Sequence, residues 1–260
     1  MDINAYLTRI GYAGPVKPDV QTLHGLQRAH MQHIPFENLD IGRKRPIRLD
    51  KDSLWDKIVV QKRGGFCYEL NGLFAQLLQE IGYQVAHLNA RVFDGEGNLG
   101  IDFDHLALLV QIPDQPGHWL ADVGFGDSFT EPLSLDERKE QVQGLRAYRL
   151  EQTSEGYITW QKNYDGSWER HYFFDLQPHQ FPDEYWPGCT YHQTSPKSSF
   201  TQWSIISRAT PTGRVSLEDG WLILTEDGQR TKHPIKDTEH YRALLMQYFN
   251  ISLSKVPYDR

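Results

Sequence analysis

Residues 63–71, Arg-Gly-Gly-Phe-Cys-Tyr-Glu-Leu-Asn, constrain this chain more than any other stretch, and they carry one of its only two cysteines. After Cys67, apolar residues recur at helical spacing as far as Ile81, and Gly82 supplies a stop signal. A thiol in the first turn of a helix faces unpaired N–H groups and the positive end of the helix dipole, which favour the thiolate. Cys67 is therefore predicted to be a nucleophile. The alternative is a buried structural cysteine, but two glycines and an arginine before it suit a tight turn better than core packing.

A cysteine nucleophile needs a base, and the base needs a partner that orients it. Residues 103–112 are predicted to form a largely buried strand. Within it, the imidazole of His105 needs a polar partner, because burial removes its hydration. A short turn rich in Pro, Gly and Asp leads to a second apolar strand, residues 119–123, which carries Asp122. The short turn predicts antiparallel neighbours, so His105 and Asp122 can meet on one face, although the register does not follow from the sequence. His105 is the candidate base and Asp122 the candidate orienting group.

Four motifs in this order resemble those of the arylamine N-acetyltransferases of the bacterial type. They are Pro-Phe-Glu-Asn-Leu at 35–39, the stretch at 63–71, Asp-His-Leu at 104–106 and Asp-Val-Gly-Phe-Gly at 122–126. The resemblance begins at the first predicted helix and weakens beyond the second strand. It implies a Cys-His-Asp triad on Cys67, His105 and Asp122, with acetyl-coenzyme A as donor. The implied acceptor is an arylamine, arylhydrazine or N-hydroxyarylamine, and the implied role is xenobiotic metabolism.

The resemblance also implies the surroundings of the triad. It places an apolar substrate wall on Phe36, Val92, Phe125 and Phe200. Coenzyme A contacts are expected at Gly124 and Gly126, with residues 195–203 as a further candidate region. Glu37 and Arg63 carry opposite charges on two of the motifs, so the prediction for them is a buried structural ion pair and not direct catalysis.

The patterns along the chain predict an α+β fold. Asp2 and Asp19 are expected to cap helices that run to about Gly11 and Ile34, and residues 54–59 and 67–81 are also helical in pattern. Strands are expected at 85–93, 103–112, 119–123, 157–163, 171–174, 202–208 and 220–225, and a last helix at 241–249. The family resemblance implies a helical bundle at 1–83, a central β-barrel at 84–190 and an α/β lid at 191–260, with the triad arranged as in papain-like cysteine proteases.

Composition narrows the class of protein. A net charge of -7 leaves no basic stripe, so nucleic acid is not an expected partner. Residues 1–4 lack the pattern of a signal peptide, and no window is apolar for long enough to span a bilayer. Cys67 and Cys189 lie 122 positions apart, which does not suggest a disulfide framework, and Cys189 is expected to be an incidental loop thiol. The prediction is a cytoplasmic enzyme without a membrane partner; no oligomeric state is predicted.

Two other patterns could suggest a ligand site, but they are predicted to have structural roles only. Residues 95–100 match Gly-x-Gly-x-x-Gly, but a strand and not a helix is expected next, so a hairpin loop is predicted instead of a dinucleotide site. His24, His30 and His33 lie on a predicted surface helix with no cluster of carboxylates or cysteines nearby. They are expected to be solvated, and no metal is predicted.

Three functions compete at this stage. The leading one is a ping-pong acetyl transfer through an acetyl-cysteine. The second keeps the triad but makes the protein a thiol hydrolase or an amide synthase. The third is a non-catalytic binding protein of the same fold, against which the intact triad argues.

Overall fold

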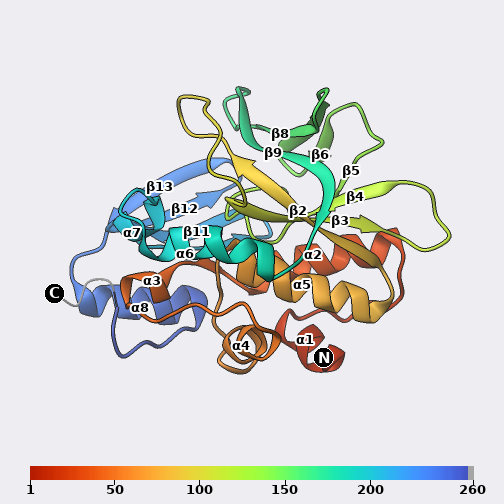
Figure 1. Ribbon diagram of the computed structural model, residues 1–260. Helices are drawn as coiled ribbons and strands as arrows, with labels where there is room; N and C mark the ends of the chain where they lie inside the picture. The colour runs from red at the N-terminus through yellow and green to blue at the C-terminus, as the bar shows by residue number, and fades with distance from the viewer. Residues whose placement is uncertain (257–260) are drawn as a thin grey trace.

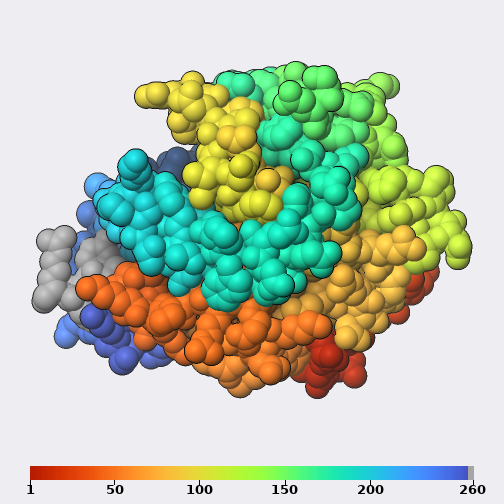
Figure 2. All heavy atoms as spheres, in the orientation of Figure 1, coloured from red at the N-terminus to blue at the C-terminus, as the bar shows by residue number. Residues whose placement is uncertain are grey.

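The structure, a computed structural model, describes residues 1–256 and has a mixed architecture of helices and two antiparallel sheets. Figure 1 shows α1, α4 and α8 on one side of the molecule and the strands β6 and β8 on the opposite side. In Figure 2 the teal and cyan residues around α6 run across the face between the orange N-terminal helices and the yellow strand region. The predicted α+β class is confirmed.

The N-terminal part is helical, as predicted. Its elements are α1 (Ile3–Arg9), α2 (Val20–His33), α3 (Leu39–Gly42), α4 (Lys51–Trp55), a π-helical turn η1 (Asp56–Val60) and α5 (Cys67–Ile81), with the two-residue strand β1 (Phe36–Glu37) between α2 and α3. Asp2 and Asp19 cap their helices, because their carboxylates accept bonds from Ala5 N and Thr22 N at 3.0 and 2.8 Å. Gly82, in the left-handed conformation, ends α5.

A nearly closed, barrel-like sheet of eight strands follows, in the order β5-β4-β3-β2-β9-β8-β7-β6. Its strands are β2 (Gln84–Val92), β3 (His105–Gln111), β4 (His118–Ala121), β5 (Leu133–Ser134), β6 (Gln141–Gln143), β7 (Arg146–Gln152), β8 (Tyr157–Lys162) and β9 (Trp168–His179). Helix α5 packs on β2 and β3. This contact buries the first turn of α5 against the start of β3, which is where the two most reactive candidates, Cys67 and His105, lie.

A second sheet of five strands has the order β1-β10-β11-β12-β13. The remaining elements are η2 (Asp183–Tyr185), α6 (Trp186–Thr194), α7 (Ser199–Gln202), β10 (Ile205–Thr210), β11 (Gly213–Glu218), β12 (Trp221–Glu226), β13 (Gln229–Pro234) and α8 (Thr238–Phe249). Strand β1 belongs to the N-terminal part but pairs here, with Phe36 opposite Ser207. The predicted division at residues 83 and 190 stays a prediction.

Several boundaries differ from the sequence prediction. The strand expected from residue 103 begins at His105, because Phe103 has φ 57° and turns the chain before the ladder starts. The strand expected from 202 begins at Ile205, since α7 occupies Ser199–Gln202. Strand β13 was missed because all six of its residues are exposed and carry no alternating apolar signal. The loop at 95–100 joins an antiparallel bridge between Phe93 and Leu99, so the hairpin prediction is confirmed.

The prediction that the three histidines of α2 are solvated is wrong for His30. Its ring is fully buried, and Nδ1 lies 2.8 Å from the hydroxyl of Tyr6. Burial lowers the pKa of His30 to about 3, so this side chain is a neutral part of the helical core. His24 does have a carboxylate beside it, since Nδ1 lies 3.0 Å from Glu131 Oε2. Its partner is more than 100 residues away, which the local pattern could not reveal.

Cys189 is also placed differently from the prediction. It lies in α6 and is fully buried, with Gln193 Nε2 3.2 Å from its sulfur, so it is a packed helical residue and not a loop thiol. Both cysteines are free. Within residues 1–256, no helix combines the length and apolar character needed to cross a membrane.

Candidate active site

Cys67 lies on the wall of a small cavity of about 190 Å³. The residues that line it are Phe36, Cys67, Val92, Asp104, His105, Gly124, Phe125, His192, Ser199 and Phe200. An engineered apolar cavity of about 150 Å³ holds benzene, so this one has room for one aromatic ring. The candidate nucleophile, the candidate base and all four expected wall residues therefore meet in one place.

The first turn of α5 holds Cys67 because the preceding chain is tightly packed. A Cβ on Gly64 would lie 1.9 Å from the carbonyl oxygen of Pro35, so only glycine allows the two backbones to approach. This close approach lets Gly65 bridge to Phe36 and accept a bond from Glu37 N at 2.8 Å. The paired glycines therefore serve backbone contact between two motifs that are distant in sequence.

Burial changes the expectation for the Cys67 thiol. Cys67 is only 3% exposed, and this burial raises the pKa of its thiol well above the usual range. A hydrogen bond from the backbone of Leu106 acts in the opposite direction and lowers that pKa in part. The helix N-terminus favours the thiolate, as expected from the sequence, but burial, which the sequence did not reveal, opposes it. A thiolate in this cavity needs a cation beside it, and two imidazoles, those of His105 and His192, lie on the same wall.

His105 and Asp122 are joined directly, with His105 Nε2 2.7 Å from Asp122 Oδ2. Strands β3 and β4 are antiparallel with Leu108 opposite Ala121, so Asp122, the next residue, falls beside the first residues of β3. With the Nε2–H tautomer, His105 donates this hydrogen bond to the carboxylate, and its Nδ1 lone pair is then free to act as a base. The predicted meeting of His105 and Asp122 is confirmed, but the strand expected at 119–123 ends at Ala121, so Asp122 lies directly after β4 and not within it.

Asp122 is held by four donors in all. Oδ2 also accepts from the Tyr172 hydroxyl at 3.0 Å, and Oδ1 accepts from Asn71 Nδ2 and Gly124 N, each at 2.8 Å. Burial alone would raise the pKa of Asp122, but the charge of His105 and these hydrogen bonds lower it below 3.8. Asp122 is thus a stable anion at neutral pH, fit to balance a positive imidazole.

Asn71 and Tyr172 are site residues that the sequence reasoning missed. Asn71 Nδ2 also donates to Leu106 O at 2.6 Å, and Asn71 Oδ1 accepts from Val123 N at 2.9 Å. This one side chain therefore ties α5 to β3, which carries the base, and to the segment after β4, which carries its partner. Asn71 lies within the 63–71 motif, so the motif itself was a signal; Tyr172 lies in a predicted strand and gave none.

Gly124 supports the site by close packing. A Cβ on Gly124 would lie 2.7 Å from Cys67 Cα and 2.8 Å from Asn71 Nδ2, closer than atoms in proteins approach. Gly124→Ala should therefore displace the first turn of α5 and cost about 1–3 kcal/mol of unfolding free energy, with a loss of activity. Urea unfolding and initial rates measure both effects. Gly95→Ala is the matched control, because its Cβ would meet nothing within 4 Å; equal effects in the two variants would contradict the packing role.

Aromatic rings form most of the apolar wall. The ring centroids of Phe36 and Phe200 lie 6.0 Å apart, and Phe125 meets the His105 ring edge-on at 5.4 Å. Such a wall leaves few groups for water to bind, so it favours a flat apolar substrate and keeps water from the sulfur.

The ion pair expected between Arg63 and Glu37 is present and belongs to a larger buried network. Arg63 Nη2 lies 2.6 Å from Glu37 Oε1 and 3.1 Å from Asp40 Oδ1. Lys57 lies 3.1 Å from Asp40 and 2.8 Å from Glu69, whose Oε2 accepts the Phe66 N–H that precedes the nucleophile. The network therefore reaches the cap of α5 without lining the cavity.

A wider hollow of about 780 Å³, here called the outer pocket, adjoins the cavity and shares Phe36, Phe125 and Phe200 with it. Gly126 lines the outer pocket, whereas Gly124 lines only the inner cavity. The outer pocket also contains four arginines, at 146, 170, 214 and 230, and Trp203. Four carboxylates, of Asp127, Asp165, Glu169 and Glu218, line it as well, so the outer pocket is charged with both signs and partly aromatic, whereas rings form most of the wall of the inner cavity.

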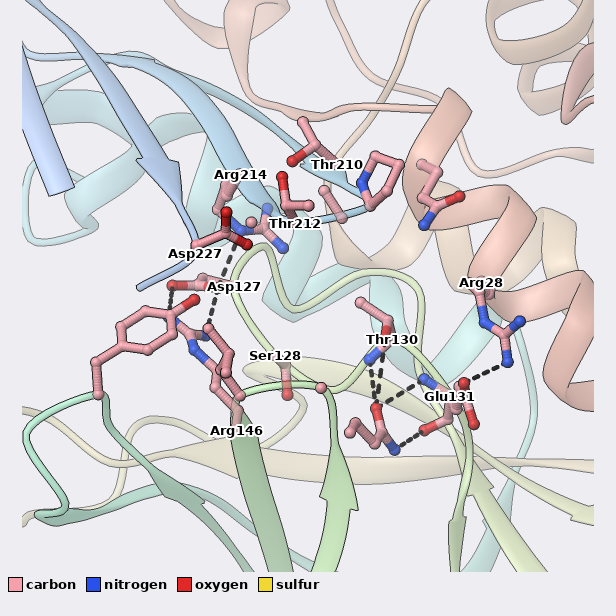
Figure 3. Close-up of a pocket in the computed structure, with 18 of the residues that line it drawn as sticks. Arg28, Asp127, Ser128, Thr130, Glu131, Arg146, Thr210, Thr212, Arg214 and Asp227 are labelled. Carbon is pink, nitrogen blue, oxygen red and sulfur yellow. Dashed lines mark hydrogen bonds and ion pairs between the residues drawn. The ribbon is translucent and has the colours of Figure 1, made fainter. Parts of the chain in front are cut away.

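A further pocket of about 540 Å³ shares Asp127, Arg146 and Arg214 with the outer pocket (Figure 3). Asp127 accepts from Arg146 Nη1 at 2.7 Å and from Arg214 Nε at 2.9 Å, which ties the barrel to the second sheet. Neither Cys67 nor His105 lines this pocket. Its larger volume therefore does not make it the reactive site.

Comparisons with known proteins agree on one family. A family model described as N-acetyltransferase matches residues 19–257. The chain is 33% identical to the arylamine N-acetyltransferase / N-hydroxyarylamine O-acetyltransferase of Salmonella typhimurium, covering 98% of this chain and 90% of that one. It is 30% identical to the proansamycin X synthase of Amycolatopsis mediterranei, covering 94% and 95%. A solved Mycobacterium marinum arylamine N-acetyltransferase in complex with CoA superposes with a TM-score of 0.90 at 31% identity, covering 96% and 93%.

Proposed function

The chain belongs to the arylamine N-acetyltransferase family, a class of acyltransferases, and we propose that it transfers acetyl groups from acetyl-coenzyme A to arylamines and arylhydrazines through an acetyl-cysteine on Cys67. The observation that carries the proposal is the shared cavity of Cys67 and His105, with His105 bonded to the buried Asp122 at 2.7 Å. In this proposal the three residues act as a catalytic triad, arranged as in papain-like cysteine proteases.

In the first half-reaction, His105 Nδ1 takes the Cys67 proton and the thiolate attacks the thioester carbonyl. Because burial disfavours a lone thiolate, proton transfer and attack depend on the imidazolium that Asp122 stabilises. Backbone N–H groups of Cys67 and of the start of β3 are proposed to hold the oxyanion, since N–H groups in a first helical turn lack helical partners. The carbon–sulfur bond to coenzyme A breaks, and its sulfur takes the proton from His105.

In the second half-reaction, the acceptor nitrogen attacks the acetyl group on Cys67. His105 accepts the proton that the nitrogen loses and returns it to the departing Cys67 sulfur. The products are the acetylated acceptor and the free enzyme. An N-hydroxyarylamine would react through its hydroxyl oxygen by the same steps, so O-acetylation is part of the proposal.

Coenzyme A is proposed to occupy the outer pocket, with its thioester end entering the inner cavity past the shared phenylalanines. Arginine forks suit phosphate groups. Of the four arginines of the outer pocket, Arg146 and Arg214 are bonded to Asp127, so Arg170 and Arg230 are proposed to bind the phosphates. Of the two glycines expected to contact coenzyme A, Gly126 fits this location, whereas the contacts of Gly124 fit packing on Cys67. Phe36, Val92, Phe125 and Phe200 are proposed to hold the acceptor ring.

Two free cysteines suit a reducing compartment, so a cytoplasmic location is proposed as well. A role in xenobiotic metabolism goes with the arylamine acceptors. Both proposals concern the setting of the enzyme and not its chemistry.

A second candidate, an amide synthase with the same triad, is favoured by the similarity to a protein named as a synthase. Acetyl-coenzyme A turnover with and without an arylamine separates the candidates. We expect release of free coenzyme A to be slow without an amine and to rise at least about tenfold with one, because attack by water on the acetyl-cysteine is limited in an apolar cavity. Fast turnover without amine would instead favour a hydrolase, and no turnover in either condition would favour the synthase or a binding protein.

A further inference from the structure

A second His–Asp pair faces the cavity of Cys67. His192, from α6, lies with Nε2 3.0 Å from Asp104 Oδ1, and both residues line the cavity together with Cys67 and His105. The Asp104 side chain is 13% exposed and that of His192 is 8% exposed. The proposed mechanism uses neither of them.

The hydrogen bonds of His192 and Asp104 show which of the two side chains can still bind a ligand. His192 Nδ1 is engaged by Ser198 Oγ at 3.0 Å, so both ring nitrogens are occupied. Asp104 Oδ2 accepts one bond, from Val92 N at 3.2 Å. Oδ1 lies 3.0 Å from His192 Nε2, whose hydrogen bond goes to the backbone oxygen of Asp104 at 3.1 Å. A carboxylate can accept about four bonds, so Asp104 keeps acceptor capacity that His192 lacks.

The charged groups of the cavity wall also indicate Asp104 as the residue that can bind a ligand. Of the described residues that line the cavity, Asp104 is the one carboxylate and none is lysine or arginine. The other anion nearby, Asp122, is already bonded to four donors and does not line the cavity. Besides apolar rings, two imidazoles and Ser199, a substrate in this cavity therefore meets one carboxylate that has free acceptor sites.

We infer that Asp104 sets the acceptor specificity of this enzyme, favouring arylamines whose ring carries a neutral hydrogen-bond donor and disfavouring those that carry an anion. This inference rests on the proposed function. A donor such as a carboxamide N–H satisfies the carboxylate, whereas a substrate carboxylate must lose its water next to a like charge. In 190 Å³ the ring has little room to move such a group away from the wall.

The competing role for Asp104 is structural, a tie between His192, Val92 and the start of β3. That role would affect every acceptor equally, through the position of His105 or the reactivity of Cys67. A ratio of kcat/KM between two acceptors removes such common effects. The ratio is therefore the readout that a structural role does not move.

The test compares 4-aminobenzamide with 4-aminobenzoate, and their 3-substituted isomers, as acceptors with acetyl-coenzyme A. The amide withdraws electrons at least as strongly as the carboxylate, so amine basicity does not favour it. Wild type should prefer the amide by at least about tenfold in kcat/KM for one or both isomers. In Asp104→Asn, which removes the charge but keeps the size, the preference should fall to within about threefold. Asp102→Asn is the control, because Asp102 is 74% exposed and does not line the cavity.

Two results would overturn the inference: equal use of amide and carboxylate by wild type, or an unchanged preference in a folded Asp104→Asn protein. Should Asp104→Asn lose its cooperative thermal transition, Asp104→Ser removes the same charge and replaces it in the comparison. Failure of the proposed function looks different, because wild type would then acetylate none of these amines and not aniline either.

Discussion

Cys67→Ser should leave less than about one hundredth of the wild-type rate of arylamine acetylation, because a hydroxyl is a far weaker nucleophile than a thiolate. The fold should remain, since serine is close to cysteine in size and the loss concerns reactivity and not volume. Initial rates with acetyl-coenzyme A and an arylamine measure the effect, and far-UV circular dichroism checks the fold. A folded Cys67→Ser protein with more than that residual rate would count against covalent catalysis by Cys67.

Cys189→Ala is the matched control for that experiment. Cys189 is the other free cysteine, is also buried, and does not line the cavity. Its removal should lower stability through the small void that it leaves, while acetyl transfer continues. If Cys189→Ala were inactive and Cys67→Ser active, the assignment of the nucleophile would be wrong.

Asp122→Asn should lower kcat by about 10⁴-fold, the loss seen when the equivalent charge is removed from a serine-protease triad. Each oxygen of Asp122 accepts from two donors: His105 and Tyr172 at Oδ2, and Asn71 and Gly124 at Oδ1. An amide NH₂ in either orientation would therefore face two donors, which should cost about 1–3 kcal/mol of unfolding free energy. Initial rates and urea unfolding measure the two effects.

Tyr172→Phe is the graded comparison for Asp122→Asn. It removes one of the four donors but leaves the carboxylate charge and its bond to His105. The loss of activity should be much smaller than that of Asp122→Asn. Near-normal turnover of Asp122→Asn would show that another group orients His105.

The central residues of the site could be predicted because their signals are local. Cys67 opens a strongly periodic helix, and His105 and Asp122 are polar residues in apolar strands joined by a short turn. A short turn restricts two strands to antiparallel pairing, which brings the two side chains near each other. Their catalytic roles stay predictions until they are tested.

What could not be predicted depends on packing between distant segments. Tyr172 reaches Asp122 from β9, 50 residues further along the chain. His192 meets Asp104 across 88 residues, through a helix that the sequence pattern did not predict. The raised pKa of Cys67 has the same origin, because its burial arises where α5 packs on β3. Local helix and strand patterns contain no information on such contacts.

The most direct test of the account is the mass of the protein after incubation with acetyl-coenzyme A and no acceptor. The account predicts a gain of one acetyl group, mapped by peptide analysis to the fragment that contains Cys67, because the thioester forms before the acceptor binds. The apolar wall of the cavity should slow its hydrolysis, and an added arylamine should remove it. No acetylation, or acetylation of a lysine in place of Cys67, would contradict the account.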